Sequence, residues 1–156
     1  MASTPIRSYI IDYLATLLGA RRNLAQFDTE DIGENGLTVV LPGESESGSA
    51  RYTTQTMTMP VSVMRSALLR GSKEPWHVIA EEAGAQLEVD VFAALLSLQE
   101  HFADDLSDDI AARAMITGVK VDELTDGVNG YMVHVFATVE YVYPTGNPYV
   151  EIDDAD

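Results

Sequence analysis

The sequence predicts an α+β fold in which two helices pack on one face of an antiparallel sheet of about four strands. Two segments have the three- and four-residue apolar spacing of helices, and four have the residue content or alternation of strands. Along the chain their order is helix, two strands, long helix, two strands. Strands joined by short turns pair antiparallel, and the apolar face of their sheet needs helices to cover it.

The first predicted element is a helix that begins at Pro5 and ends near Gly19. Proline is well tolerated in a first helical turn, and Ser3 or Thr4 before it is expected to supply a hydroxyl cap. An apolar stripe at steps of three and four predicts that this helix packs on the sheet. The stripe consists of Ile6, Ile10, Tyr13, Leu14, Leu17 and Leu18.

Residues 37–41 form the first predicted strand, because a β-like run lies between Asn35-Gly36 and Pro42-Gly43. The segment that follows, residues 43–50, contains only glycine, serine, glutamate and one alanine. It offers no large apolar side chain to a core, which predicts a mobile acidic loop over 43–50.

Residues 51–64 form the clearest predicted strand, in which threonine, methionine and valine suit a pleated surface. Pro60 lies inside this run and has no backbone N–H to give to a neighbouring strand. We therefore expect either an edge position for the strand or a bulge at Pro60.

The longest predicted helix covers residues 76–102. Its apolar residues recur mostly at steps of three and four and are Trp76, Ala80, Ala83, Leu87, Val91, Ala94, Leu95, Leu98 and Phe102. Two strands then form a hairpin, at residues 115–124 and 131–143, with an interruption at Gly118. We expect the centre of the helix to pack on these strands, with Leu87, Val91 and Leu95 against Val119, Val133 and Val135 or their neighbours.

One domain accounts for residues 1–150, since a single core usually occupies about 100–200 residues. The last six residues, 151–156, include four acids, which predicts a disordered acidic tail.

The charge balance is strongly acidic, with 9 lysines and arginines against 25 aspartates and glutamates and a net charge of −16. Such a molecule is repelled by phosphate backbones and by anionic membranes. The sequence has no cysteine, which excludes disulfides and thiolate chemistry. No signal segment or membrane-spanning run is visible, so we expect a soluble, intracellular protein.

A search for catalytic, cofactor-binding and metal-ligating residues finds none. His77 and His101 lie on one helix about 36 Å apart, too far to share a metal ion. His134 points away from the apolar set of its strand and is expected to be solvated or at an interface. Residues 122–127 resemble a calcium loop but lack its oxygen spacing and its terminal glutamate. We therefore expect no enzyme and no cofactor.

Several short phrases occur along nearly the whole chain, among them Ile6-Arg7-Ser8-Tyr9-Ile10, the arginine-led strand at 51–63 and Val139-Glu140-Tyr141. Together with the order of the elements they resemble the tail-terminator, or tail-completion, proteins of long-tailed bacteriophages. That family opens with a helix of the Ile-Arg-x-x-Ile kind and continues with an arginine-led strand and a long helix. Its final strand pair runs from a Gly-Val-x-Val-x-x-Leu phrase to Val-x-Tyr. The matching segments here are Ile6-Arg7-Ser8-Tyr9-Ile10, residues 51–63, 76–102 and 118–124, and Val139-Glu140-Tyr141, with Pro144-Thr145-Gly146-Asn147-Pro148 after them.

The resemblance implies a structural virion protein without an active site, which forms a hexameric ring on the end of the tail tube. Such a ring stops polymerisation of the tube and joins the tail to the head or neck. The implied partners are further copies of the chain, the tail-tube protein and a neck or head-completion protein, with no membrane. DNA passes through the ring without specific binding. The implied location is the virion tail, assembled in the host cytoplasm.

Other functions remain open at this point. Head–tail connector and tail-tube proteins share related folds, and a small-ligand-binding α+β domain would place a pocket between sheet and helices. An enzyme that uses paired carboxylates is the third alternative. A ring predicts a mass near six protomers, whereas a ligand binder predicts a monomer or dimer with a cavity.

Contacts between subunits are expected where the scarce cations meet acidic neighbours. Arg51 and Arg65 flank the clearest strand and are our candidates for contacts to a neighbour's carboxylates. Tyr141 and Tyr143 are further candidates, at the place where the family's last strand often ends in Tyr-Arg.

Overall fold

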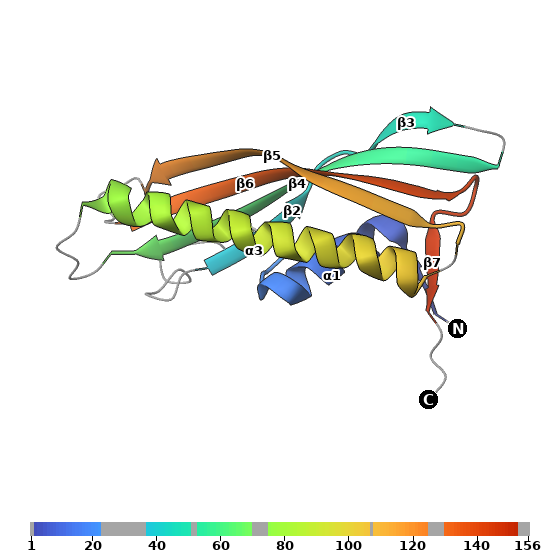
Figure 1. Ribbon diagram of the computed structural model, residues 1–156, viewed down its shortest axis with the longest axis horizontal. Coiled ribbons are helices and arrows are strands. Elements are labelled where there is room, and N and C mark those ends of the chain that lie inside the picture. The colour runs from blue at the N-terminus through green and yellow to red at the C-terminus, as the bar shows by residue number, and fades with distance from the viewer. Residues whose placement is uncertain are drawn as a thin grey trace.

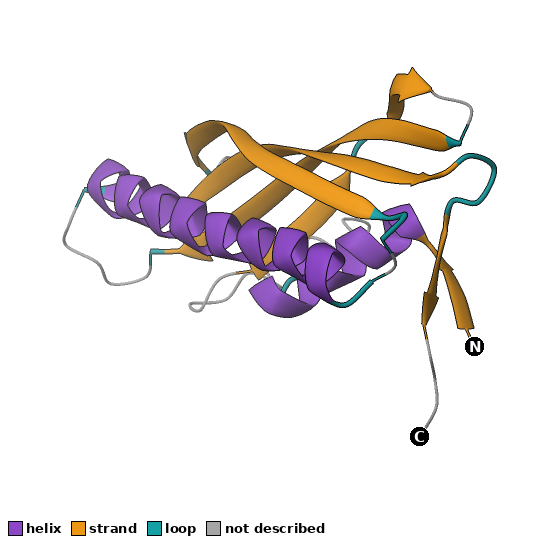
Figure 2. Cartoon of the chain, turned by 45° about the vertical axis from the view of Figure 1, so that its right-hand side comes forward, coloured by secondary structure: helices purple, strands orange, loops and turns teal. Residues whose placement is uncertain are grey.

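A computed structural model of the chain describes residues 2–22, 37–50, 53–69, 75–106, 108–124 and 130–152. Within these ranges an antiparallel five-stranded sheet has the order β2-β4-β6-β5, with β3 beside β4, and a separate two-stranded sheet joins β1 to β7. Both helices, α1 and α3, lie on the same face of the larger sheet (Figures 1 and 2). The predicted α+β class is confirmed, with one more strand in the main sheet than expected.

Helix α1 runs from Ile6 to Leu18 and ends at Gly19, whose φ of 61° is the left-handed conformation that favours glycine. The hydroxyl cap predicted from Ser3 or Thr4 is wrong. Residues Ala2–Pro5 are extended and form β1, which pairs with β7 at Tyr149–Ile152. Pro5 then stands at the cap position, and no side chain there bonds the helix. A partner strand almost the whole chain away decides this conformation.

Strands β2, at Leu37–Pro42, and β3, at Glu46–Ala50, pair one after the other with the same side of β4, at Thr54–Leu68. The sequence predicts a mobile loop over 43–50, and for Glu46–Ala50 the loop is wrong. Backbone hydrogen bonds hold a strand without large apolar side chains. The intervening residues are fixed by side chains from far along the chain. Arg7 donates to the Gly43 carbonyl and to Ser45 Oγ, and the Tyr141 hydroxyl also donates to Ser45 Oγ.

Pro60 lies inside the sheet, so the prediction of an edge position or a bulge is wrong. Its strand pairs continuously with β6 on one side, where Pro60 faces Thr138. On the other side β2 gives way to β3 at this level, and the Gly43 N–H donates to the Pro60 carbonyl across a distance of 2.6 Å. Since the N–H and C=O of a strand residue point the same way, the missing N–H faces this break, where no strand requires it.

Helix α3 runs from Trp76 to Asp104, slightly longer than predicted. Its predicted apolar centre is confirmed: Leu87, Val91 and Leu95 are at most 2% exposed and belong to one core with Val133 and Val135 of the sheet. Gly84 lets the helix approach the sheet, because a Cβ there would lie 3.3 Å from Val121. In the described part of the chain, no helix is long and apolar enough to span a bilayer.

Strands β5, at Ala111–Glu123, and β6, at Gly130–Pro144, form the predicted hairpin. The interruption expected at Gly118 is a register shift between Ile116 and Gly118. The turn at 125–129 lies outside the described residues. The acidic tail is partly wrong, because residues 151 and 152 belong to β7; residues 153–156 lie outside the described part.

Candidate functional site

The four residues predicted for subunit contacts do not form one surface. Arg51 lies outside the described residues. Tyr141 is only 2% exposed and belongs to the core, so a contact with another subunit is not available to it in this fold. Tyr143 is half-buried and stacks on Tyr141, and burial raises the pKa of its hydroxyl. Its role between subunits stays a prediction.

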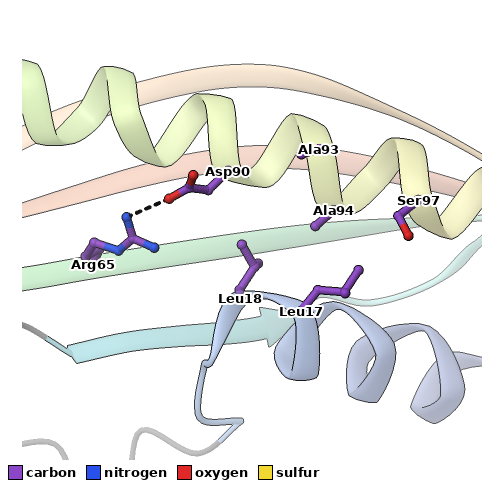
Figure 3. A pocket seen from close by; sticks show the side chains of 7 residues that line it. All are labelled: Leu17, Leu18, Arg65, Asp90, Ala93, Ala94 and Ser97. Atoms are coloured by element: carbon purple, nitrogen blue, oxygen red, sulfur yellow. Dashed lines mark hydrogen bonds and ion pairs between the residues drawn. The ribbon is translucent and has the colours of Figure 1, made fainter.

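Arg65 makes its contacts within the chain. Its guanidinium Nη1 lies 3.1 Å from the Asp90 carboxylate on α3, and its Nε donates to Thr38 Oγ1 on β2 (Figure 3). The side chain is half-buried between helix and sheet. Reversing its charge would place a second carboxylate beside Asp90, so such a variant would test the fold as much as any assembly.

A pocket of about 410 Å³ opens beside this ion pair, between α1, α3 and β4. Its apolar wall includes Leu17, which is 51% exposed although the sequence predicts it in the packed stripe of α1. Figure 3 shows the side chains of both helices bordering the pocket. Its lining residues are Leu17, Leu18, Arg65, Asp90, Ala93, Ala94 and Ser97. The pocket lies between helices and sheet, where a ligand-binding domain of this class would hold a small molecule.

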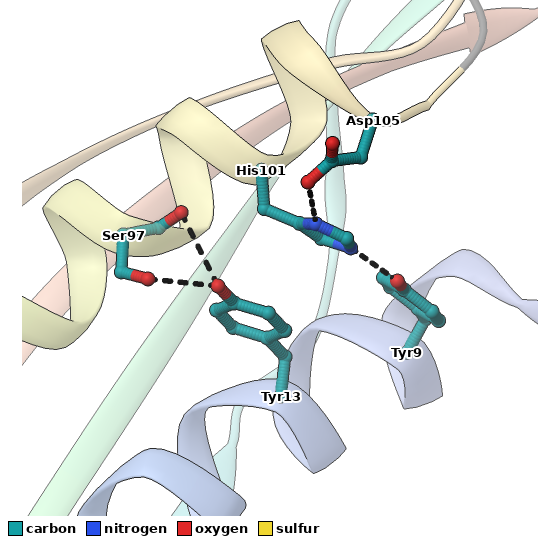
Figure 4. A network of polar contacts seen from close by, with 5 residues as sticks. All are labelled: Tyr9, Tyr13, Ser97, His101 and Asp105. Atoms are coloured by element: carbon teal, nitrogen blue, oxygen red, sulfur yellow. Dashed lines mark hydrogen bonds and ion pairs between the residues drawn. The ribbon is translucent and has the colours of Figure 1, made fainter.

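A network of polar aromatic contacts joins α1 to α3 (Figure 4). The His101 ring stacks on Tyr9 and on Tyr13, with ring centroids 5.8 and 4.9 Å apart. Nδ1 of His101 lies 2.8 Å from an Asp105 carboxylate oxygen, and Nε2 lies 2.5 Å from the Tyr9 hydroxyl. Next to them the Tyr13 hydroxyl is 2.7 Å from Ser97 Oγ. Sequence reasoning missed this cluster, although its members recur four residues apart on each helix.

The Tyr9–His101–Asp105 chain has the connectivity of a hydrolase triad, with a phenol in place of the serine. Burial raises the pKa of Tyr9, and Tyr13 and Asp105 raise it further. A raised pKa favours the protonated hydroxyl, which keeps Tyr9 hydrogen-bonded to His101. The network therefore acts as a clamp between two helices.

His134 lies on the sheet face opposite the helices and is more buried than the sequence predicts. Its side chain is 16% exposed, its ring stacks on Phe136, and Nε2 lies 3.8 Å from the Asp122 carboxylate. Burial lowers the pKa of His134, and the opposing effect of Asp122 is smaller. Among the described residues, no three histidine, aspartate or glutamate side chains group as metal ligands.

Large apolar side chains are also exposed on α3 and on the neighbouring edge strand β5. Gln99 on α3 accepts a hydrogen bond from the Ala114 N–H of β5, so the two elements lie side by side. On β5, Met115 is 64% and Val119 42% exposed. The large apolar residues of α3 that are exposed are Val78, Val89, Phe92 and Leu96. Large exposed apolar patches mark interaction sites more often than isolated apolar residues do.

The two edges of the main sheet differ in charge. Among the described strands β5 pairs with β6 alone, and it holds the exposed cations Arg113 and Lys120 together with Asp122, 3.4 Å from Lys120, and Glu123. β3, on the opposite side of the β4–β6 pair, holds exposed Glu46, and Glu44 just precedes it. Sequence reasoning missed this pattern because it took residues 43–50 as a loop. A loop gives no indication that the acids of β3 and the cations of β5 lie at two edges of one sheet.

No protein-family model matches this chain, and the curated proteins contain no match to it. Proposals about its function therefore depend on the geometry described above and on the resemblance of its sequence phrases.

Proposed function

We propose that this protein is a structural subunit that assembles through the edges of its sheet into a closed ring. The resemblance to tail terminators specifies the ring as a hexamer that caps a phage tail tube, stops its polymerisation and joins it to the neck. The observation that carries the proposal is the pair of different sheet edges, β5 with cations and acids on one side and β3 with acids on the other.

The β5 edge suits addition of a strand from another molecule. A strand with one neighbour leaves a row of backbone donors and acceptors unpaired, with which a strand of another molecule can pair. Gln99 covers β5 only at Ala114 among the described contacts. Beyond the bulge, Val119 adds exposed apolar surface to the edge, and Lys120 adds a cation.

Two different complementary edges favour a ring. Pairing of β5 on one subunit with β3 on the next is a head-to-tail contact, and such contacts close into rings when the rotation between subunits allows it. Lys120 would then approach the acidic side chains at Glu44 and Glu46, which supports this pairing over β5 with β5.

The remaining parts of the proposal follow from the resemblance and are supported by the net charge of the chain. A net charge of −16 repels DNA, which suits a ring through which DNA passes without being bound. The proposed partners are further copies of the chain, a tail-tube protein and a neck protein, in a virion tail assembled in the host cytoplasm.

Native mass spectrometry and sedimentation test the ring directly. We expect a species near six protomers at high protein concentration. Lys120→Glu should shift the distribution toward the monomer, because it places an acid against the acidic β3 edge. Combining it with Glu46→Lys should restore assembly by exchanging the two charges.

Arg22→Glu is the matched control, since it makes the same charge change at the exposed end of α1, where Arg22 pairs with Asp12. It should leave the mass distribution unchanged. A chain that stays monomeric at every concentration and salt level contradicts the ring. Equal effects of Lys120→Glu and Arg22→Glu contradict the edge pairing.

The pocket beside Arg65 favours a second candidate, a small-ligand-binding domain. Its volume of about 410 Å³ lies within the roughly 300–1,000 Å³ of small-molecule sites, and it combines apolar walls with an ion pair. The same mass measurement separates the two functions. A monomer that retains a bound small molecule in the native mass spectrum supports the ligand-binding domain over the ring.

A further inference from the structure

The outward face of α3 carries a second apolar stripe, which none of the packing described so far uses. We define the outer stripe as Val78, Ala85, Val89, Phe92 and Leu96; Val89 is 61% and Phe92 60% exposed. Its spacings are seven, four, three and four residues, and exposed Glu82 occupies the seam position between Val78 and Ala85, so the stripe is continuous from Ala85 to Leu96. The buried stripe of the same helix, through Leu87, Val91 and Leu95, already contacts the sheet.

The spacing of the outer stripe fits another helix. Steps of three and four residues are those of a helix–helix seam, in which each apolar residue fits between residues of the partner. The stripe extends about 27 Å along α3, or five helical turns. A partner helix of about 20 residues would therefore contact it along its whole length.

Charge decides which helix can occupy this position. In its 29 residues α3 contains no lysine or arginine, and the exposed acids beside the outer stripe include Glu81, Glu88 and Glu100. A second copy of α3 would bring these acids against acids, which costs free energy at each pair. A helix with lysine or arginine beside its own apolar stripe would meet the same acids favourably.

We infer that the outer stripe of α3 is a docking site for a basic amphipathic helix of a different protein. Phe92 and Leu96 supply the central apolar contact, and the flanking glutamates select a cationic partner over an acidic one. This inference goes beyond the proposed ring and does not require it, since the ring was assigned to the edges of the sheet.

Designed peptides test the inference with the full chain. The probe is a fluorescently labelled 20-residue amphipathic peptide that carries leucine at the seam positions and lysine at the flanking positions. Fluorescence anisotropy should show that it binds at least tenfold more tightly than the same peptide with glutamate flanks. It should also bind more tightly than a scrambled peptide of equal composition, which controls for simple attraction to a chain of charge −16.

The variant Phe92→Ser with Leu96→Ser should lower the affinity at least tenfold, and circular dichroism should show an intact fold because both side chains are exposed. Leu17→Ser is the matched control, since Leu17 is an exposed leucine on α1, and it should bind the peptide normally. Wild type and variant should have the same oligomeric state in sedimentation.

Three results of the binding experiments would overturn the inference. They are equal binding of the scrambled peptide, unchanged binding by the Phe92→Ser, Leu96→Ser variant, and absence of binding by the lysine peptide. A shift of the variant from oligomer to monomer in sedimentation would also overturn it, because a second copy of the chain would then occupy the outer stripe. Loss of the ring on Lys120→Glu alone bears only on the proposed function.

Discussion

The pKa values and ion pairs of single residues in this fold depend on the side chains that the fold places beside them. His134 is held between Phe136 and Asp122 on the face of the sheet away from the helices. The burial that lowers its pKa outweighs the carboxylate that raises it, so the folded chain favours the neutral imidazole. The unfolded chain has no such preference and accepts a proton at the ordinary value of about 6.5.

We therefore predict that the free energy of unfolding decreases as the pH falls below about 6.5 and through the lower folded pKa of His134. In that range the unfolded state binds more protons, so acid favours unfolding. Urea denaturation of wild type and His134→Gln between roughly pH 7.5 and pH 5 measures this. The variant should show a weaker pH dependence, and identical slopes would contradict the assignment to His134.

The candidate site shows what sequence can predict at this scale. From the sequence Arg65 is a cation that flanks the predicted strand and a candidate for a subunit contact, but its partner Asp90 lies on another element of the same chain, 25 residues away. Tyr141 follows the alternation of β6 into the core, and that alternation already argued for burial over a surface contact. The spacing of Tyr9 and Tyr13 on one helix, and of Ser97, His101 and Asp105 on the other, could have indicated the clamp.

At the level of elements, α3 has a buried and an exposed apolar face, and only one of them stabilises the monomer. Leu95 is 2% exposed, whereas Phe92, three residues earlier, is 60% exposed. Truncation of a buried leucine removes its contacts and leaves a cavity, at a cost of about 2–5 kcal/mol. An exposed phenylalanine keeps most of its surface in water in the folded state, so its truncation removes few contacts.

We predict that Leu95→Ala lowers the free energy of unfolding by about 2–5 kcal/mol, while Phe92→Ala changes it by less than about 1 kcal/mol. Chemical denaturation of both variants side by side measures the difference. A loss below about 1 kcal/mol for Leu95→Ala would show that the packing face of α3 is wrongly assigned.

Elements with internal periodicity could be predicted from sequence, and elements that depend on distant partners could not. The spacing of α3 and the alternation of β6 predict their positions to within a few residues. β3 has neither signal, because its conformation comes from pairing with β4. β1 reads as a helix cap in isolation and becomes a strand only because β7 lies beside it. The break opposite Pro60 likewise depends on where β2 ends.

For the whole molecule, charge acts in two opposing ways on self-association. Each subunit brings a net charge of −16, so assembly concentrates negative charge. Pairing of Lys120 with the acids near β3 opposes this repulsion. An exposed ion pair contributes about 0–1 kcal/mol at most, whereas the repulsion acts over the whole contact.

We therefore predict that added salt strengthens association of the isolated chain, since screening over about 8–10 Å removes more repulsion than attraction. Sedimentation equilibrium at roughly 50 and 300 mM sodium chloride measures the association constant. A constant that falls with salt would show that the edge ion pairs outweigh the net charge. The association constant of the Lys120→Glu variant should also rise with salt, because the substitution removes only the attraction between Lys120 and the acids near β3.

The pairing of β1 with β7 also implies an order of events in folding. Ala2 pairs with Ile152, so this clip closes a loop of almost the entire chain. The entropic cost of closing a loop rises with its length, and four short pairs give little in return. Once the main sheet has formed, β1 and β7 are already held near each other, so little further loss of chain entropy is needed to pair them. The clip is thus a late step of folding, and its four pairs complete a structure whose topology was already decided.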